Sequence, residues 1–164
     1  MAQRDWVSVF VGLGANLGQA QNAVEDAVVA LGKLPNTRVL ACSALYRSAP
    51  VDASGPDYVN AVAHLESRIN AYELLRAFQD LENRAGRERP YFHAPRTLDI
   101  DMLLFGGSKI QSQELTVPHP RMMERAFVLL PLAELAPDLV PSTALQQVKN
   151  QAIEKLSIPG SQRS

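Results

Sequence analysis

The stretch Thr97-Leu98-Asp99-Ile100-Asp101-Met102-Leu103-Leu104-Phe105 alternates apolar and acidic residues before it becomes continuously apolar. This pattern predicts a β-strand, because successive side chains of a strand point to opposite faces. Asp99 and Asp101 would then share one face at a spacing of about 7 Å. The opposite face would carry Leu98, Ile100 and Met102.

The two aspartates predict a magnesium site. Like charges on a strand within apolar sequence repel each other and are costly to desolvate. A divalent cation would remove that cost, because Mg²⁺ prefers one or two carboxylates together with substrate phosphates. Carboxylates in this arrangement can also bridge two ions about 3.5–4 Å apart. The competing interpretation is a solvent-facing strand edge with ordinary acidic residues.

The segments before this strand predict an α+β domain. Residues 6–11, 37–47 and 59–66 are strand-like, and a glycine-rich turn is expected over 12–18, where it could deliver Asn16 toward a site. One amphipathic helix is expected to end near Gly32, and a second to begin at Asn70, which with Glu73 resembles a capping box. The order strand, helix, strand, strand, helix, strand is that of a ferredoxin-like βαββαβ core with an antiparallel sheet.

The C-terminal third is expected to add a hairpin and helices to this core. Gly106-Gly107 predicts a turn toward a short strand near Ile110. Residues 121–136 are expected to be helical in part, with Pro131 kinking or splitting the helix. A last helix is expected over 144–156, followed by a frayed tail at about 160–164. The length of 164 residues indicates a single domain, 1–164.

Composition excludes several classes of protein. A net charge of -1 argues against broad binding of nucleic acid, which needs a basic face. The single cysteine, Cys42, allows no intrachain disulfide and is expected to be a buried, inert thiol, and the three histidines lack zinc-ligand spacing. Without a signal peptide or a membrane-length apolar run, we expect a soluble cytoplasmic protein.

Arginines near the acidic strand point to phosphate chemistry. Their guanidinium groups match phosphate oxygens bidentately and stay charged, and they stand at positions 84, 87, 89, 96, 121 and 125. Familiar nucleotide motifs are missing, however. The pattern Gly12-x-Gly14 lacks the third glycine of a dinucleotide site, and Gly32-Lys33 lacks the Ser or Thr of a P-loop.

Taken together, these motifs resemble the 6-hydroxymethyl-7,8-dihydropterin pyrophosphokinase family over nearly the whole chain. The resemblance is carried by residues 12–18, 45–50, 56–61, 94–101 and 115–121. It implies a ferredoxin-like α+β fold whose mobile loops close over the substrates. It also implies transfer of the pyrophosphoryl group of ATP to the pterin's hydroxymethyl oxygen, with release of AMP, as a step of folate synthesis.

The resemblance also implies roles for individual residues. Asp99 and Asp101 would hold two Mg²⁺ ions, and Arg87 and Arg96 would engage the phosphates as catalytic residues. The pterin ring would stack between Tyr58 and Phe127, with its edge read by Asn60 and by the backbone near Ser48 and Val51. Contacts to ATP would come from Leu75, Gln79, Glu82, Arg89, Met102, Leu115, Thr116, His119 and Arg125. The sequence departs from the family pattern at His93, Glu114 and Pro120.

Two alternative functions fit the same order of elements. One is another two-metal nucleotidyl transferase on a ferredoxin-like fold, which would release pyrophosphate rather than AMP from ATP. The other is an RNA-binding domain, which would need a basic, aromatic-studded sheet, whereas residues 59–66 are mostly small and apolar. On the preferred interpretation the partners are ATP and the pterin, without nucleic acid or membrane, and the protein is a monomer.

Overall fold

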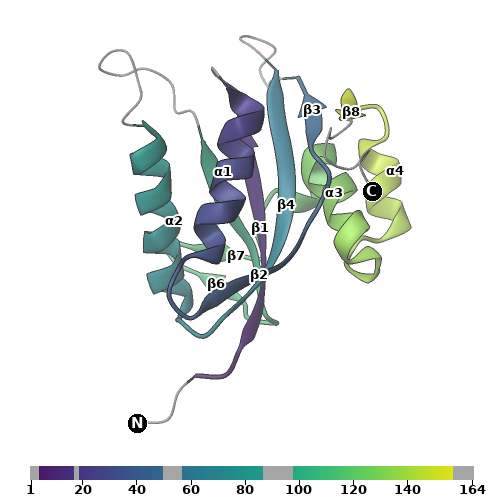
Figure 1. The fold of residues 1–164 in the computed structure, drawn as a ribbon. Helices are drawn as coiled ribbons and strands as arrows, with labels where there is room; N and C mark the ends of the chain where they lie inside the picture. Colours follow the sequence, from purple (N-terminus) through teal and green to yellow (C-terminus); the bar gives the residue numbers. More distant parts are fainter. Residues whose placement is uncertain (1–3, 17–18, 50–56, 87–97, 157–164) are drawn as a thin grey trace.

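A six-stranded antiparallel sheet runs through the middle of the molecule, between two pairs of helices (Figure 1). The computed structural model describes residues 4–16, 19–49, 57–86 and 98–156. Within that part, the strands lie in the order β5-β1-β4-β3-β8, and β2 pairs with β4 beside β3. Their bounds are β1 (Val7–Ala15), β2 (Thr37–Cys42), β3 (Tyr46–Ser48), β4 (Tyr58–Ser67), β5 (Asp99–Phe105) and β8 (Ile153–Lys155).

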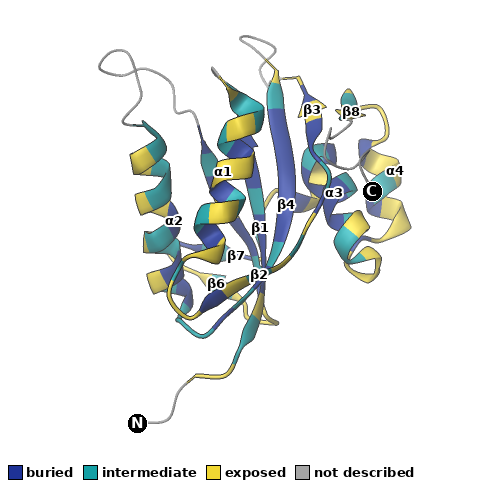
Figure 2. Cartoon of the chain, viewed as in Figure 1, coloured by how far each residue is buried: buried dark blue, intermediate teal, exposed yellow. Residues whose placement is uncertain are grey.

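Each face of the sheet packs against its own pair of helices. The helices α1 (Ala20–Gly32) and α2 (Ala71–Gly86) cover one face, where Val9 and Val11 of β1 are fully buried. On the other face Phe10 packs with α3 (Ala126–Leu135) and α4 (Ser142–Val148). Figure 2 shows buried residues along the strands and exposed residues on the outer sides of the helices.

Short elements complete the chain. A hairpin of β6 (Ile110–Gln111) and β7 (Thr116–Val117) follows β5, and the 3-10 helices η1 (Met122–Glu124) and η2 (Pro137–Leu139) flank α3. The α+β class, the antiparallel sheet and the added hairpin and helices are therefore confirmed. Among the helices that the structure describes, none is long and apolar enough to cross a membrane.

The predicted turn over 12–18 is wrong for its first half, because β1 continues to Ala15. Gly14 pairs with Asn60 of β4 on one side and with Asp99 of β5 on the other. The backbone of the glycine run is thus paired with a strand on each side, β4 and β5. The composition of the run alone does not predict this pairing.

Two further boundaries differ from the prediction. Residues 37–47 contribute to two strands, because β2 ends at Cys42 and β3 begins at Tyr46. Between them, the backbone N–H of Ser43 donates to Val62 O, and Ser43 Oγ accepts the Val62 N–H. The last helix ends at Val148 instead of near 156, since the following residues pair as β8 with the edge of β3. In both cases the partner strand is not the next strand along the chain: β2 pairs with β4, and β8 pairs with β3.

Two predictions about single residues are also wrong. The helix α3 runs unbroken through Pro131, so the predicted split at this residue is wrong, and the helical region is interrupted instead at Arg125, whose backbone is extended. Cys42 is exposed at the C-terminal end of β2. Partial desolvation and the charge of Glu134 nevertheless raise the pKa of its thiol, which disfavours a nucleophilic role.

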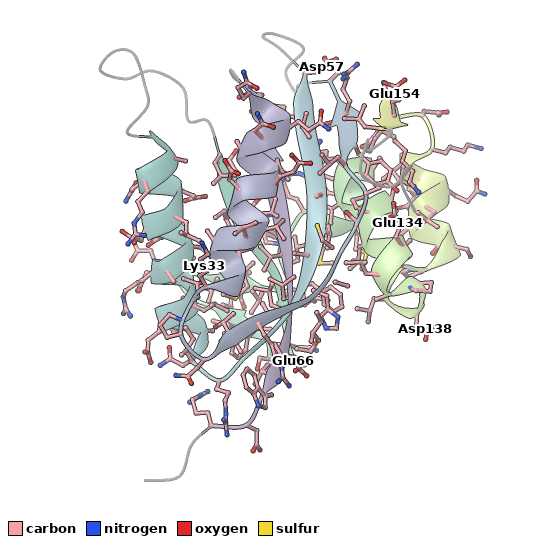
Figure 3. The ribbon with its side chains drawn as sticks, viewed as in Figure 1. Lys33, Asp57, Glu66, Glu134, Asp138 and Glu154 are labelled. Atoms are coloured by element: carbon pink, nitrogen blue, oxygen red, sulfur yellow. The ribbon has the colours of Figure 1, made fainter. Side chains whose placement is uncertain are left out.

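Glu134, near the end of α3, anchors this helix to the sheet (Figure 3). Its carboxylate accepts hydrogen bonds from the Ala44 N–H at 3.0 Å and from the Tyr46 hydroxyl, and lies 3.7 Å from the Lys155 ammonium. Burial and the bond to Glu134 raise the pKa of Tyr46, so the hydroxyl stays a donor. The C-terminal end of α3 is therefore tied to β3 and β8.

The predicted capping box at the start of α2 is confirmed. Asn70 Oδ1 accepts the Glu73 N–H at 2.9 Å, and the side-chain Nδ2 of Asn70, in place of its backbone N–H, donates back to the Glu73 carboxylate. We expect Asn70→Ala to lower the free energy of unfolding by about 1 kcal/mol, because the first turn of α2 loses its cap. Chemical denaturation measures this change. Asn83→Ala, on the exposed side of the same helix, is the control, and equal stability of the two variants would contradict the assignment.

Candidate active site

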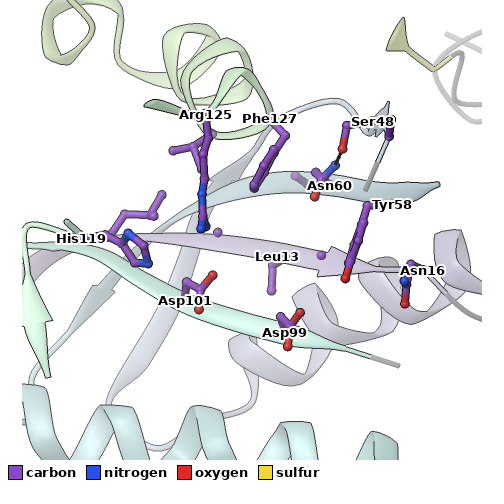
Figure 4. Close-up of a pocket in the computed structure, with 16 residues that line it drawn as sticks. Leu13, Asn16, Ser48, Tyr58, Asn60, Asp99, Asp101, His119, Arg125 and Phe127 are labelled. Carbon is purple, nitrogen blue, oxygen red and sulfur yellow. Dashed lines mark hydrogen bonds between the residues drawn. The ribbon is translucent and has the colours of Figure 1, made fainter. Parts of the chain in front are cut away.

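A cavity of about 490 Å³ lies over the sheet face opposite α1 and α2, between β5 and the start of α3 (Figure 4). Its lining comes from β1, β3, β4, β5, α3 and the segment between β7 and η1. Residues predicted from separate parts of the sequence meet here: Ser48, Tyr58, Asn60, Asp99, Asp101, His119, Arg125 and Phe127. Asn16 also lines the cavity.

The strand β5 presents its two aspartates to this cavity, as the alternation predicts. Ile100, between them, is buried in the core on the other face, whereas Asp99 is half-buried and Asp101 is exposed. In the pairing with β1, Asp99 lies beside Gly14 and Asp101 beside Gly12. Since glycine has no side chain, the two carboxylates are not covered from the neighbouring strand (Figure 4).

The acid pair fits a magnesium ion better than a metal held by protein ligands alone. Mg²⁺ keeps several waters and takes one or two carboxylates plus substrate phosphates. Among the residues that the structure describes, no histidine, cysteine or further carboxylate joins the pair to form a cluster of three possible ligands. An open cavity with two carboxylates on its floor therefore suits an ion that arrives with a phosphorylated ligand.

Asn60 lies at the base of the cavity between the rings of Tyr58 and Phe127 (Figure 4). It is only 4% exposed, and its amide nitrogen donates to Ser48 Oγ at 2.7 Å. This bond fixes the orientation of the amide and leaves Oδ1 as the acceptor on the side of Gly14. Two aromatic faces and one fixed amide acceptor suit a flat ligand with N–H groups on its edge.

His119 and Arg125 form the polar end of the cavity, beside the slot that Tyr58, Asn60 and Phe127 make for a flat ligand (Figure 4). The backbone N–H of His119 donates to Leu103 O at 2.9 Å, and its Nδ1 accepts the Arg121 N–H at 3.1 Å. The neutral ring must then carry its proton on Nε2, where it can donate to a ligand. Desolvation lowers the pKa of His119, with Arg125 and Arg121 acting in the same direction and Asp101 against it. The guanidinium of Arg125 lies 5.4 Å from the Phe127 ring centre.

This lowered pKa predicts how stability depends on pH. An unfolded histidine titrates near 6.5, and folded His119 titrates lower, so the unfolded state binds the proton first. We therefore expect the free energy of unfolding to fall as the pH drops below 6.5 toward the folded pKa. Denaturation at a series of pH values should show a shallower fall for His119→Gln, which cannot titrate. Identical slopes for the two proteins would contradict this origin of the pH dependence.

Other predicted residues lie away from the cavity lining or outside the described ranges. Met102 and Leu115 are buried in the core on the side of α2, where Leu75 packs partly buried and Gln79 is exposed. Thr116 belongs to β7, and Glu82 Oε2 accepts the Ile100 N–H at 2.7 Å. Val51, Arg87, Arg89 and Arg96 fall outside the described residues. All of these assignments stay predictions.

Sequence reasoning missed the role of the glycines as the floor of the cavity. Gly12 and Gly14 both line it, and a Cβ on Gly14 would lie 3.1 Å from Asn60 Oδ1. It also missed Glu82 as a support of β5, because the residue it bonds, Ile100, lies on a different element. The alternation of glycine with apolar residues over 11–15 was the available signal for an extended, ligand-facing strand.

Comparison with known proteins identifies the family of the chain. Residues 10–137 match the family model of 7,8-dihydro-6-hydroxymethylpterin-pyrophosphokinase. The chain is 46% identical over 132 residues to the 2-amino-4-hydroxy-6-hydroxymethyldihydropteridine pyrophosphokinase of Pseudomonas aeruginosa, covering 80% of this chain and 82% of that protein. The enzyme of the same name from Haemophilus influenzae is 41% identical over 135 residues, with 82% and 84% covered.

A solved structure agrees on the fold. A triple mutant of Plasmodium falciparum HPPK-DHPS superposes with a TM-score of 0.67 at 12% identity, over 88% of this chain and 42% of that longer chain. At this identity the likeness shows the fold alone. The matching family model and the close relatives carry the assignment further: the chain belongs to the 7,8-dihydro-6-hydroxymethylpterin-pyrophosphokinase family.

Proposed function

We propose that this protein transfers the pyrophosphoryl group of ATP to 6-hydroxymethyl-7,8-dihydropterin in folate synthesis. The hydroxymethyl oxygen attacks the β-phosphorus and gives up its proton to water, the bond from that phosphorus to the oxygen bridging to the α-phosphate breaks, and AMP leaves. The observation that carries the proposal is the meeting, in one cavity, of a slot for a flat ring with a pair of carboxylates. The substrate follows from the family, and the ferredoxin-like variant of the α+β fold is proposed on the same ground.

The pterin ring is proposed to stack between Tyr58 and Phe127. Asn60 Oδ1 accepts an N–H from the edge of the ring, while the bond to Ser48 keeps the amide from rotating. By the family resemblance, backbone groups near Val51 are also proposed to contact the edge of the pterin ring. In this proposed arrangement the hydroxymethyl group points toward the aspartate side of the cavity, which is the proposed phosphate side.

The phosphate side is proposed to be formed by Asp99, Asp101, His119 and Arg125. Asp99 and Asp101 would hold two Mg²⁺ ions, which neutralise charge on the phosphates as the bridging bond breaks. His119 donates from Nε2 to a phosphate oxygen, and Arg125 contributes a fixed positive charge. The assignments of Arg87, Arg89 and Arg96 to the phosphates, and of Leu75, Gln79, Glu82, Met102, Leu115 and Thr116 to ATP, follow the family resemblance.

A substitution at Gly14 tests the proposed position of the pterin beside Asn60. We expect Gly14→Ala to weaken pterin binding by about tenfold, because the new methyl group presses on Asn60 Oδ1, which the bond to Ser48 prevents from moving aside. Calorimetric titration with the pterin measures this effect. Gly107→Ala is the control, since a Cβ there meets nothing within 4 Å. Wild-type affinity in Gly14→Ala would contradict the proposed position of the pterin edge.

A product assay tests the function itself. Purified protein, Mg²⁺, ATP and 6-hydroxymethyl-7,8-dihydropterin are incubated together, and AMP and the pterin diphosphate are separated by chromatography. We expect equal amounts of the two products, with none formed when the pterin or Mg²⁺ is left out. Absence of AMP above the pterin-free control would overturn the proposal.

A further inference from the structure

The cavity wall that carries Arg125 and Phe127 has a second hollow behind it. This rear cavity, of about 380 Å³, is lined by residues of β3, η1, the start of α3 and the segment around β8. Ser48, Ala49, Arg125 and Phe127 line both cavities. The wall therefore has free volume on both sides at this point, and close packing alone does not fix the Phe127 ring.

One side chain on the rear side, that of Gln151, bridges the backbone of this wall. Its Oε1 accepts the Ala126 N–H at 2.8 Å, and its Nε2 donates to the Glu124 carbonyl oxygen at 2.8 Å. The two bonds bracket Arg125, whose extended backbone (φ −123°, ψ 117°) separates η1 from α3. No side chain at the N-cap position of α3 caps its N-terminus, and Gln151 satisfies from a distance one of the first backbone N–H groups of the helix, which have no acceptor within the helix.

Gln151 is itself held in place by its neighbours in the chain. Its backbone N–H donates to Val148 O at 3.0 Å, at the end of α4. Two residues later Ile153 pairs with Ser48 of β3, and Ser48 accepts the bond from Asn60. One short segment thus touches both the aromatic wall and the strand that orients the amide of the slot.

We propose that Gln151 is a positioning residue of the pterin slot, which holds the Arg125 turn so that Phe127 and Arg125 face the substrate. The proposal rests on the function proposed above and extends it to a residue that does not line the cavity of the slot. The role needs a donor and an acceptor on one neutral side chain, which an amide supplies. Replacement by Met keeps the length but removes both bonds, and replacement by Glu keeps the acceptor for Ala126 only.

The test combines a local measurement with kinetics on the full chain. In Gln151→Ala and Gln151→Met we expect amide hydrogen exchange over residues 126–130 to accelerate and KM for the pterin to rise about fivefold. Gln151→Glu should fall between these variants and wild type, because the helix start keeps its cap. Gln147→Ala, an exposed glutamine of α4, is the matched control and should match wild type in both measurements.

The two readouts distinguish a positioning role from a purely structural one. A lower melting temperature in both Ala and Met variants, with pterin KM and hydrogen exchange unchanged at a temperature where they are folded, would overturn the positioning role. Faster exchange without a change in KM would overturn it too, because loosening the Arg125 turn would then have no effect on pterin binding. Wild-type protein that forms no AMP would instead contradict the proposed function, while the exchange data would still report on the bonds of Gln151.

Discussion

Asp99→Asn and Asp101→Asn are each expected to lower magnesium-dependent turnover by at least about a hundredfold while the fold stays intact. Each substitution keeps the size of the side chain and removes the charge that is proposed to bind the cation. Both side chains face the cavity from β5, and Ile100 between them makes the core contacts of this part of the strand. Turnover at saturating ATP and pterin, measured over a range of Mg²⁺ concentrations, gives the size of the loss.

The control for these variants is Asp138→Asn. Asp138 is exposed in η2 and does not line the cavity, so its turnover should equal that of wild type. Circular dichroism and thermal unfolding establish that each variant is folded. A near-normal rate in either cavity variant would show that this carboxylate does not hold a required metal ion.

Asn60→Ala is expected to lower kcat/KM for the pterin by about a hundredfold. Asn60 is buried, and the amide that supplies Oδ1 to the slot is oriented by its bond to Ser48. In the variant the substrate N–H would be buried without an acceptor, and the free energy of its desolvation would not be compensated by a hydrogen bond. Steady-state kinetics with the pterin varied at saturating ATP measure the change.

Binding measurements separate this effect from a general loss of structure. The affinity of Asn60→Ala for ATP in the presence of Mg²⁺ should stay close to that of wild type, because the Phe127 ring lies between Asn60 and Arg125 (Figure 4). The free energy of unfolding should fall by about 1–3 kcal/mol, since Ser48 Oγ loses its partner. Asn83→Ala, on the exposed side of α2, serves as the control, and unchanged pterin affinity in Asn60→Ala would show that Asn60 does not bind the pterin.

Elements with self-sufficient local patterns could be predicted from the sequence. The alternation over 97–105 predicts β5 and the shared face of its two aspartates, and the Asn70–Glu73 pattern predicts the start of α2. In both cases the assignment follows from the pattern itself, the alternation of side chains along a strand and a cap within one helical turn, although the partner strand of β5 is the distant β1. The glycine-rich end of β1 and the strand β8 were missed, because their backbone groups are satisfied by strands distant in sequence.

The residues of the candidate site also divide into those that a local pattern predicts and those that it does not. The aspartate pair follows from strand geometry, whereas Tyr58, Asn60 and Phe127 were predicted only through resemblance to a family, because nothing in their spacing predicts that they meet. Their meeting depends on α3 packing over β3 and β4, which Glu134 and Gln151 support from either end of the helix. Neither residue belongs to a local motif.

The fate of the β-phosphorus of ATP decides between pyrophosphoryl transfer and adenylyl transfer. ATP radiolabelled at the β-phosphorus is incubated with the protein, Mg²⁺ and 6-hydroxymethyl-7,8-dihydropterin, and the products are separated. Pyrophosphoryl transfer predicts that the label moves to the pterin and that one AMP appears for each pterin labelled. Release of the label as pyrophosphate, with the adenylyl group on the acceptor, would identify a nucleotidyl transferase and contradict the proposed function.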